Sequence, residues 1–210
     1  RPPRGTPIEE LDTPSLLVDL DAVENNFDAV AETYRDTVCK MRAHTKNTKS
    51  PLLAHMQIRA GGTVGGVCTA KVSEAEVMVE GGVNDILIAN QVVARDKIAR
   101  LCVLAAQGDM KVCVDNPRNV RDLSKIAVDH GVTIGVLIEV DTSMGRGGVR
   151  NAEDGVELAK LAESLPGVDF RGVMSHQSLG EYVDRETRFL ISRKDIQVCL
   201  DVKAAIEAAG

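Results

Sequence analysis

Three basic or titratable side chains, Arg42, His44 and Lys46, occupy alternate positions at the end of a predicted strand over residues 38–45. Because alternate side chains of a strand point to the same face, we expect these three to lie together. Neighbouring cations favour the neutral amine of a lysine, which is the form that makes a Schiff base with an aldehyde. On a buried face such a cluster also favours an anionic ligand, whereas on a solvated strand edge it would need none.

Groups that follow other predicted strands could complete a ligand site. The run 141–148, Asp-Thr-Ser-Met-Gly-Arg-Gly-Gly, contains glycines that allow a close backbone approach, and it carries Arg146. His176 follows the last predicted strand. Taken alone, the glycine-rich run is also typical of a structural turn, and the histidine of a group satisfied by a neighbouring carboxylate. Thr69 and Asn90 end two further strands, where short polar side chains either bind a ligand or cap a helix.

Two acidic side chains, Glu139 and Asp141, stand at alternate positions of one predicted strand and therefore share a face. The spacing resembles a pair of catalytic carboxylates. We prefer the interpretation that they form salt bridges with interior basic groups such as Arg42 or Arg146, because buried charges need partners.

Apolar strand patterns alternate with longer amphipathic patterns along most of the chain, which predicts a parallel sheet covered by helices. Strands are predicted over residues 38–45, 65–70, 85–89, 111–114, 133–140 and 169–175. Helices are predicted over residues 21–34, 51–60, 73–80, 94–106, 116–130, 153–164 and 184–209. Six consecutive βα units indicate part of an α/β fold of the (β/α)8 TIM-type barrel kind, in which chemistry lies at the carboxyl ends of the strands.

The first residues of the chain differ from this pattern. Residues 1–20 are predicted to form an N-terminal arm that ends in a short strand over 16–20. Asp21 and Ser73 are expected to cap the helices that begin beside them. Residues 21–210 would then form a partial α/β barrel.

Taken together, these stretches resemble the family of D-threonine aldolase and D-serine dehydratase. The resemblance rests on residues 42–50, Arg-Ala-His-Thr-Lys-Asn-Thr-Lys-Ser, preceded by Thr-Pro-Ser-Leu-Leu-Val-Asp-Leu-Asp at 13–21. It continues through Gly-Val-Cys-Thr at 66–69 and Ser-Glu-Ala-Glu at 73–76, and it covers essentially the whole chain. One departure is visible, since family members often have a histidine where this chain has Thr48.

The resemblance implies a fold-type III enzyme that uses pyridoxal 5'-phosphate (PLP), with a barrel like the N-terminal domain of alanine racemase. Lys46 would form the Schiff base with the cofactor, and His44 would be a second catalytic residue. Arg146 would lie against the ring oxygen of the cofactor, and His176 would pack on its ring. Arg42 and Thr69 complete the predicted cofactor-binding set.

The implied activity is that of a lyase on D-3-hydroxy amino acids, with aldol cleavage of D-threonine or D-3-hydroxyaspartate preferred. The products would be glycine or a glycine derivative and an aldehyde. D-serine dehydratase activity is an alternative, and a non-catalytic PLP carrier is another. A third, a barrel that binds some other phosphate, would use Lys46 only as a phosphate contact. The family also implies a homodimer and a divalent metal ion (Mn, Mg or Zn), whose ligands would lie beyond residue 210 with the last barrel strands and a C-terminal β-domain.

Composition argues against several other classes of protein. A net charge of −6, with three Phe, two Tyr and no Trp, leaves little with which to bind nucleic acid. No apolar run has the length of a membrane span and no signal-peptide pattern opens the chain, so a cytoplasmic protein without membrane contact is expected. The five cysteines have no Cys-x-x-Cys spacing and are expected to be mostly buried free thiols rather than metal ligands.

Overall fold

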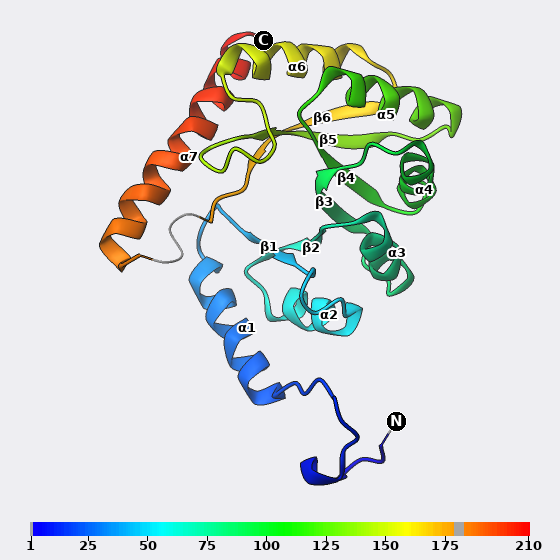
Figure 1. The fold of residues 1–210 in the computed structure, drawn as a ribbon, viewed down its shortest axis with the longest axis vertical. Coiled ribbons are helices and arrows are strands. Elements are labelled where there is room, and N and C mark those ends of the chain that lie inside the picture. The colour runs from blue at the N-terminus through cyan, green and yellow to red at the C-terminus, as the bar shows by residue number, and fades with distance from the viewer. Residues whose placement is uncertain (1, 179–182) are drawn as a thin grey trace.

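The computed structural model describes residues 2–178 and 183–210, which form one parallel sheet flanked by helices (Figure 1). Its six strands are neighbours in chain order, from β1 to β6. The strands are β1 (Met41–His44), β2 (Thr63–Thr69), β3 (Asp85–Gln91), β4 (Asp109–Val114), β5 (Ile134–Val140) and β6 (Val168–Ser175). The helices are the short 3-10 helix η1 (Ile8–Glu10), then α1 (Leu20–Tyr34), α2 (Pro51–Ala60), α3 (Val72–Glu80), α4 (Arg95–Ala105), α5 (Pro117–Asp129), α6 (Ala152–Ser164) and α7 (Arg185–Ala208).

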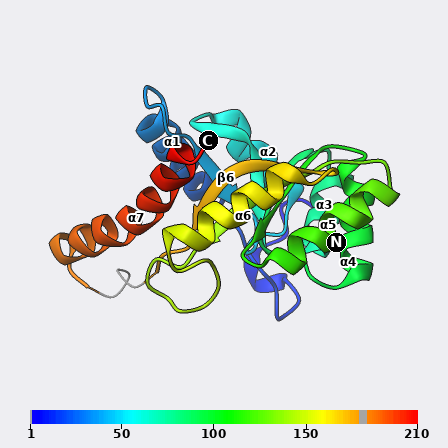
Figure 2. The same cartoon turned by 90° about the horizontal axis from the view of Figure 1, so that it is seen from above.

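A helix follows each strand, so the chain repeats the βα unit from β1 to α7. This confirms the predicted class, an α/β barrel-like fold of which six units are present. The strands follow an arc with α3, α4 and α5 outside it (Figure 1), and a view from above shows α1 and α7 at the opposite end of the molecule (Figure 2). Because all strands are parallel, their carboxyl ends lie along one edge of the sheet.

The apolar core lies between the sheet and its covering helices. Alternate strand side chains, such as Ile86 and Ile88 in β3 and Val112 and Val114 in β4, are completely buried there, as is Leu101 of α4. Burying one such side chain contributes about 1.5–3 kcal/mol relative to leaving it exposed. With the apolar side chains on the helix-covered face, the inner face is left for polar groups.

Two predicted helix caps are wrong. Asp19, not Asp21, caps α1, and its Oδ1 accepts a hydrogen bond of 3.0 Å from the backbone N–H three residues later. Ser73 lies inside α3 and caps nothing. The carboxylate of Glu74 instead accepts a hydrogen bond of 2.8 Å from the backbone N–H of Ala70, just before the helix. In both helices a carboxylate satisfies a backbone donor at the start, which is the usual requirement of a helix terminus.

The predicted strand over residues 16–20 is also wrong. Residues 16–19 belong to no strand, and Leu20 is the first residue of α1. Leu16 is fully exposed, and the N-terminal segment extends away from the sheet beyond α1 (Figure 1). A strand requires a neighbour that accepts and donates its backbone hydrogen bonds, and the described residues provide none here. The domain boundary at residue 20 stays a prediction.

The five cysteines are free thiols. Cys102, Cys113 and Cys199 are buried and Cys68 is half-buried, as expected, but Cys39 is exposed because it precedes β1 instead of lying within it. Within the described ranges, no helix is both long enough and apolar enough to cross a membrane.

Candidate active site

A cavity of about 230 Å³ lies at the carboxyl ends of the strands on the inner face of the sheet. Four of the predicted site residues line this cavity, although they come from segments that are far apart in the chain. His44 ends β1, Lys46 follows it, Arg146 follows β5 and His176 follows β6. The remaining lining residues are Ala70, Ala89, Asn90 and Met174. The fold therefore brings together side chains that stand up to 132 positions apart in the chain, from His44 to His176.

The turn after β1 directs Lys46 into this cavity. Thr45 is buried on the opposite face, where its N–H and Oγ1 both donate to the carbonyl oxygen of Cys68, at 2.9 and 3.1 Å. The backbone N–H of Lys46 then donates to Nδ1 of His44 at 3.4 Å. With Thr45 held outward, the alternation of the strand leaves His44 and Lys46 on the cavity side, as the spacing predicted.

His44 is held in its neutral form at neutral pH. Loss of surrounding water lowers its pKa below the usual value, and the positive charge of Lys46 lowers it further. A hydrogen bond with the backbone of Cys68 and the charge of Glu74 oppose this shift without reversing it.

Arg146 contacts a partly buried polar cluster formed by the ends of three neighbouring strands. Its Nη2 lies 3.5 Å from Oε1 of Glu139, a carboxylate that is 4% exposed. The side-chain amide of Gln91 donates to Glu139 at 2.6 Å and to Asp115 at 3.2 Å. Asp115 also accepts the backbone N–H of Gly148 at 2.9 Å. The cluster therefore fixes both the arginine and the loop that carries it.

The expected salt bridges of the two strand carboxylates are confirmed in part. Glu139 pairs with Arg146, one of the two named partners, but not with Arg42. Asp141 pairs with Arg150 at 3.5 Å and also accepts a backbone hydrogen bond within its own loop. The two carboxylates have separate partners and do not act as a pair.

Arg42 points to the same side as His44 but lies deeper, toward the amino ends of the strands. Its Nη1 and Nη2 donate to the two carboxylate oxygens of Asp85 at 2.8 and 3.1 Å, and Lys111 donates to the same carboxylate at 2.8 Å. Burial alone would raise the pKa of Asp85, but these hydrogen bonds outweigh it and lower the pKa. Arg42 is not among the residues that line the cavity. Its role in cofactor binding stays a prediction.

Thr69 is completely buried at the end of β2, beside Ile88 of β3. Since Ala70 lines the cavity, strand alternation turns Thr69 toward the covering helices. Its hydroxyl has no hydrogen-bond partner among the described residues. Thr69 does not reach the cavity in this arrangement, and its predicted contact with a cofactor remains a prediction.

Gln91 and Asp115 are parts of the site that the sequence patterns did not predict. Both stand at or just after strand ends, as do Thr69 and Asn90, so the same positional signal was present. Their importance depends on which strands are neighbours, because Gln91 reaches Asp115 and Glu139 only across adjacent strand ends. Asn90, for which the sequence leaves ligand binding and helix capping open, lines the cavity.

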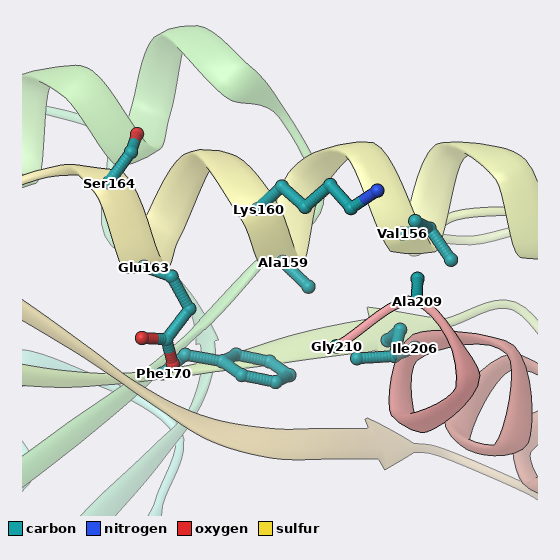
Figure 3. A pocket seen from close by; sticks show the side chains of 9 residues that line it. All are labelled: Val156, Ala159, Lys160, Glu163, Ser164, Phe170, Ile206, Ala209 and Gly210. Atoms are coloured by element: carbon teal, nitrogen blue, oxygen red, sulfur yellow. The ribbon is translucent and has the colours of Figure 1, made fainter.

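A larger hollow of about 400 Å³ lies outside the sheet, between α6, β6 and the end of α7 (Figure 3). Phe170, Ile206 and Ala159 form its apolar walls, and Lys160 and Glu163 extend from α6 at its border. It contains none of the predicted site residues. Among residues 2–178 and 183–210, no group of three or more His, Cys, Asp or Glu side chains is arranged to hold a metal ion.

Comparison with known proteins gives a consistent result. A family model described as alanine racemase, N-terminal domain, matches residues 18–210. The chain is 36% identical over 211 residues to a 3-hydroxy-D-aspartate aldolase of Paracoccus denitrificans (strain Pd 1222), covering 98% of this chain and 54% of that protein. It is 37% identical over 207 residues to a D-threonine aldolase of Arthrobacter sp, again covering 98% of this chain and 54% of the relative.

The solved structures agree with the sequence comparisons. The crystal structure of D-threonine aldolase from Filomicrobium marinum matches 96% of this chain and 54% of its own with a TM-score of 0.91 and 37% identity. The chain thus spans about half the length of the relatives it matches.

Proposed function

This chain belongs to the alanine racemase N-terminal domain family, and from that premise we propose that it is the cofactor-binding part of a PLP-dependent lyase. The proposed substrates are D-3-hydroxy amino acids of the D-threonine or D-3-hydroxyaspartate type. Relatives with those names at 36–37% identity support this choice over a dehydratase. The observation that carries the proposal is the amine of Lys46 in a cavity shared with His44, Arg146 and His176.

The residues of the cavity fit PLP by their chemistry. PLP carries an aldehyde, a ring oxygen and a phosphate, and is anionic. The lining residues supply one primary amine, one guanidinium and two imidazoles, and none of them is a carboxylate. Lys46 would hold the aldehyde carbon, Arg146 would neutralise the ring oxygen and His176 would border the ring. Arg42 and Thr69 remain proposed members of the cofactor-binding set, although neither side chain lines the cavity.

When bound, PLP supplies an electron sink for the pair of electrons left when a bond to the substrate Cα breaks. The residues of this chain would then position the ligand and exchange protons with it. The imidazole of His44, which lines the cavity, would form a hydrogen bond with a ligand atom or exchange a proton with it. Arg146, anchored by Glu139, keeps a positive charge at the cavity beside that ligand. The amine of Lys46 would exchange a proton at Nζ with the amino group of the substrate as substrate arrives and product leaves.

The proposal is tested by the absorbance spectrum of the complete protein with PLP, before and after borohydride reduction. We expect a visible band that disappears on reduction, with the pyridoxyl mass on the peptide that contains Lys46. Lys46→Ala should abolish both signals. Lys97→Ala, which removes an exposed lysine from the start of α4, should leave them unchanged. A pyridoxyl group on another lysine, or no band in the wild-type protein, would contradict the proposal.

Product analysis separates the two lyase reactions. Aldol cleavage of D-threonine or D-3-hydroxyaspartate releases glycine or its derivative with an aldehyde, whereas dehydration releases an α-keto acid and ammonia. We expect the first set of products. Ammonia and keto acid in their place would identify the protein as a dehydratase, and no product with either substrate would favour a PLP carrier.

Three further properties are proposed, two of them from the family resemblance and the location from the composition of the chain. They are a homodimeric assembly, a cytoplasmic location, and a requirement for a divalent metal ion with ligands outside this chain. Sedimentation or light scattering would test the first, and localisation of the tagged protein the second. Removal of metal with a chelator, followed by addition of Mn²⁺, Mg²⁺ or Zn²⁺, would test the third, with loss and recovery of activity as the expected result.

A further inference from the structure

A buried carboxylate outside the cavity connects two of the segments that line it. Asp195, near the middle of α7, is 7% exposed. Its Oδ2 accepts a hydrogen bond of 2.8 Å from Oγ of Ser143 and one of 3.2 Å from Nε2 of Gln177. No basic side chain of the described residues forms an ion pair with it. A buried carboxylate without a cation depends on such neutral donors, and hydrogen bonds to a charged acceptor are the stronger ones.

Both donors belong to segments that carry a residue facing the cavity. Ser143 stands three positions before Arg146 in the loop after β5, and Gln177 directly follows His176. The two segments also contact each other, because Oγ of Ser178 lies 3.3 Å from the sulfur of Met144. Asp195 is therefore the common acceptor for two segments that are separate in the chain.

Helix α7 is a firm support for this contact. One turn after Asp195, Cys199 is buried in the apolar core, and α7 packs against β6. Farther along, Val202 packs so closely on Gly155 of α6 that a Cβ at Gly155 would lie 2.6 Å from it. The loop after β5 reaches toward α7 in Figure 1. The helix is thus joined to α6 and β6, which carry the same two segments at their ends.

We propose that Asp195 is a positioning residue, which ties the Arg146 loop and the His176 segment to α7 so that both side chains face Lys46. The identity of the bound group, PLP, rests on the proposed function. The arrangement of the two segments does not depend on it. The role differs from ordinary packing, because one carboxylate sets the position of two cavity-lining groups that follow the neighbouring strands β5 and β6.

Hydrogen exchange of the protein without PLP tests the connection itself. Asp195→Ala should increase exchange in peptides covering residues 141–150 and in those covering residues 172–178. Ser143→Ala should affect mainly the first region and Gln177→Ala mainly the second. Asp201→Ala removes an exposed carboxylate of the same helix, which accepts a hydrogen bond from Gln197 one turn away; it is the matched control and should change neither. Unchanged exchange in both regions of Asp195→Ala would overturn the proposal.

PLP binding to the complete protein tests the consequence for the site. Asp195→Ala should raise the dissociation constant of PLP about tenfold, whereas Asp195→Asn, which keeps an acceptor oxygen, should raise it less than about threefold. In a protein that already lacks both Arg146 and His176 side chains, Asp195→Ala should change the constant less than about twofold, because its effect passes through those residues.

The possible failures are distinct. An equal loss of affinity from Asp195→Ala in both backgrounds would mean that it acts only through general stability, and would overturn the proposal. If Asp195→Ala does not fold, Ser143→Ala and Gln177→Ala replace it in the same comparison, and failure of both to weaken PLP binding would also overturn it. A wild-type protein that binds no PLP would overturn the proposed function, while the exchange experiment would still decide the role of Asp195.

Discussion

The guanidinium of Arg42 grips the carboxylate of Asp85 at two points, with nitrogen–oxygen distances of 2.8 and 3.1 Å. The side chains are 21% and 32% exposed, and Lys111 adds a third hydrogen bond to the same carboxylate. This ion cluster joins β1, β3 and β4 on the inner face of the sheet, below the cavity. Arg42 therefore holds β1 and β3 together through Asp85, a structural role that its position two residues before His44 in the sequence does not reveal.

We therefore expect Arg42→Met to act mainly on stability. The variant should lower the free energy of unfolding by about 1–3 kcal/mol, between the values for exposed and buried ion pairs, because Asp85 loses one of its two cations. The dissociation constant of PLP should change less than about threefold, since Arg42 does not line the cavity. Urea unfolding and a PLP titration measure the two effects. A large loss of affinity with little loss of stability would instead support the direct cofactor contact predicted from the sequence.

The two glycines that follow Arg146 should tolerate substitution very differently. Gly148 has a φ of +107°, and an added Cβ would lie 2.5 Å from the backbone nitrogen of Asp141. Gly148→Ala should lower the free energy of unfolding by at least about 2 kcal/mol and displace the Arg146 loop. At Gly147 an added Cβ would meet its nearest atoms at 3.4–3.6 Å, which is ordinary contact.

Gly147→Ala is therefore the matched control. It should change stability by less than about 1 kcal/mol. Thermal or urea unfolding of the two variants, with the visible PLP spectrum as a second readout, would compare them. Equal effects of the two substitutions would show that the backbone conformation at Gly148 is not what fixes the loop.

Loss of the negative charge of Glu139 should loosen Arg146. Glu139→Gln keeps the shape and an acceptor for Gln91, but removes the anion 3.5 Å from the guanidinium. We expect the dissociation constant of PLP to rise about fivefold and stability to fall by about 1 kcal/mol. Asp141→Asn alters a carboxylate that pairs with Arg150 instead, and it should leave PLP affinity near the wild-type value. A similar loss of affinity in both variants would contradict a specific role for Glu139.

Glu74 should make stability depend on pH. Burial alone would raise its pKa, but the Ala70 N–H and Lys49, whose Nζ lies 3.2 Å from the carboxylate, outweigh this and lower the pKa. Because the folded-state pKa is below the unfolded value, the stabilisation is fully present above the unfolded value, about 4.3, and is lost as pH falls through the folded one. Glu74→Gln should therefore cost about 1 kcal/mol at pH 7 and progressively less below about pH 4.

Urea unfolding of wild type and Glu74→Gln at several pH values would measure this difference. Glu80→Gln, at the exposed end of the same helix, is the control and should show no such dependence. A constant difference between wild type and Glu74→Gln from pH 7 to pH 3 would show that charge is not the cause.

Local sequence patterns predicted most of the elements and the faces of their side chains. The helix predicted over residues 51–60 is α2, from Pro51 to Ala60, and all six predicted strands are present with shifted ends. The alternation of Arg42, His44 and Lys46 correctly placed them on one face. These features depend on repeats of two or 3.6 residues and on backbone requirements at helix starts, which neighbouring residues alone satisfy.

Tertiary structure decided how far along the sheet each side chain lies and what it meets. Arg42 stands two residues before His44, roughly 6.6 Å along the strand, and so reaches Asp85 at the start of β3 instead of the cavity. Gln91 joins Asp115 and Glu139, and Asp195 joins Ser143 and Gln177, only because distant strands and α7 are neighbours in space. The same reason explains residues 16–20, whose strand-like pattern has no adjacent strand to pair with among the described residues. Register and pairing are properties of the assembled sheet, and a local repeat contains no information about them.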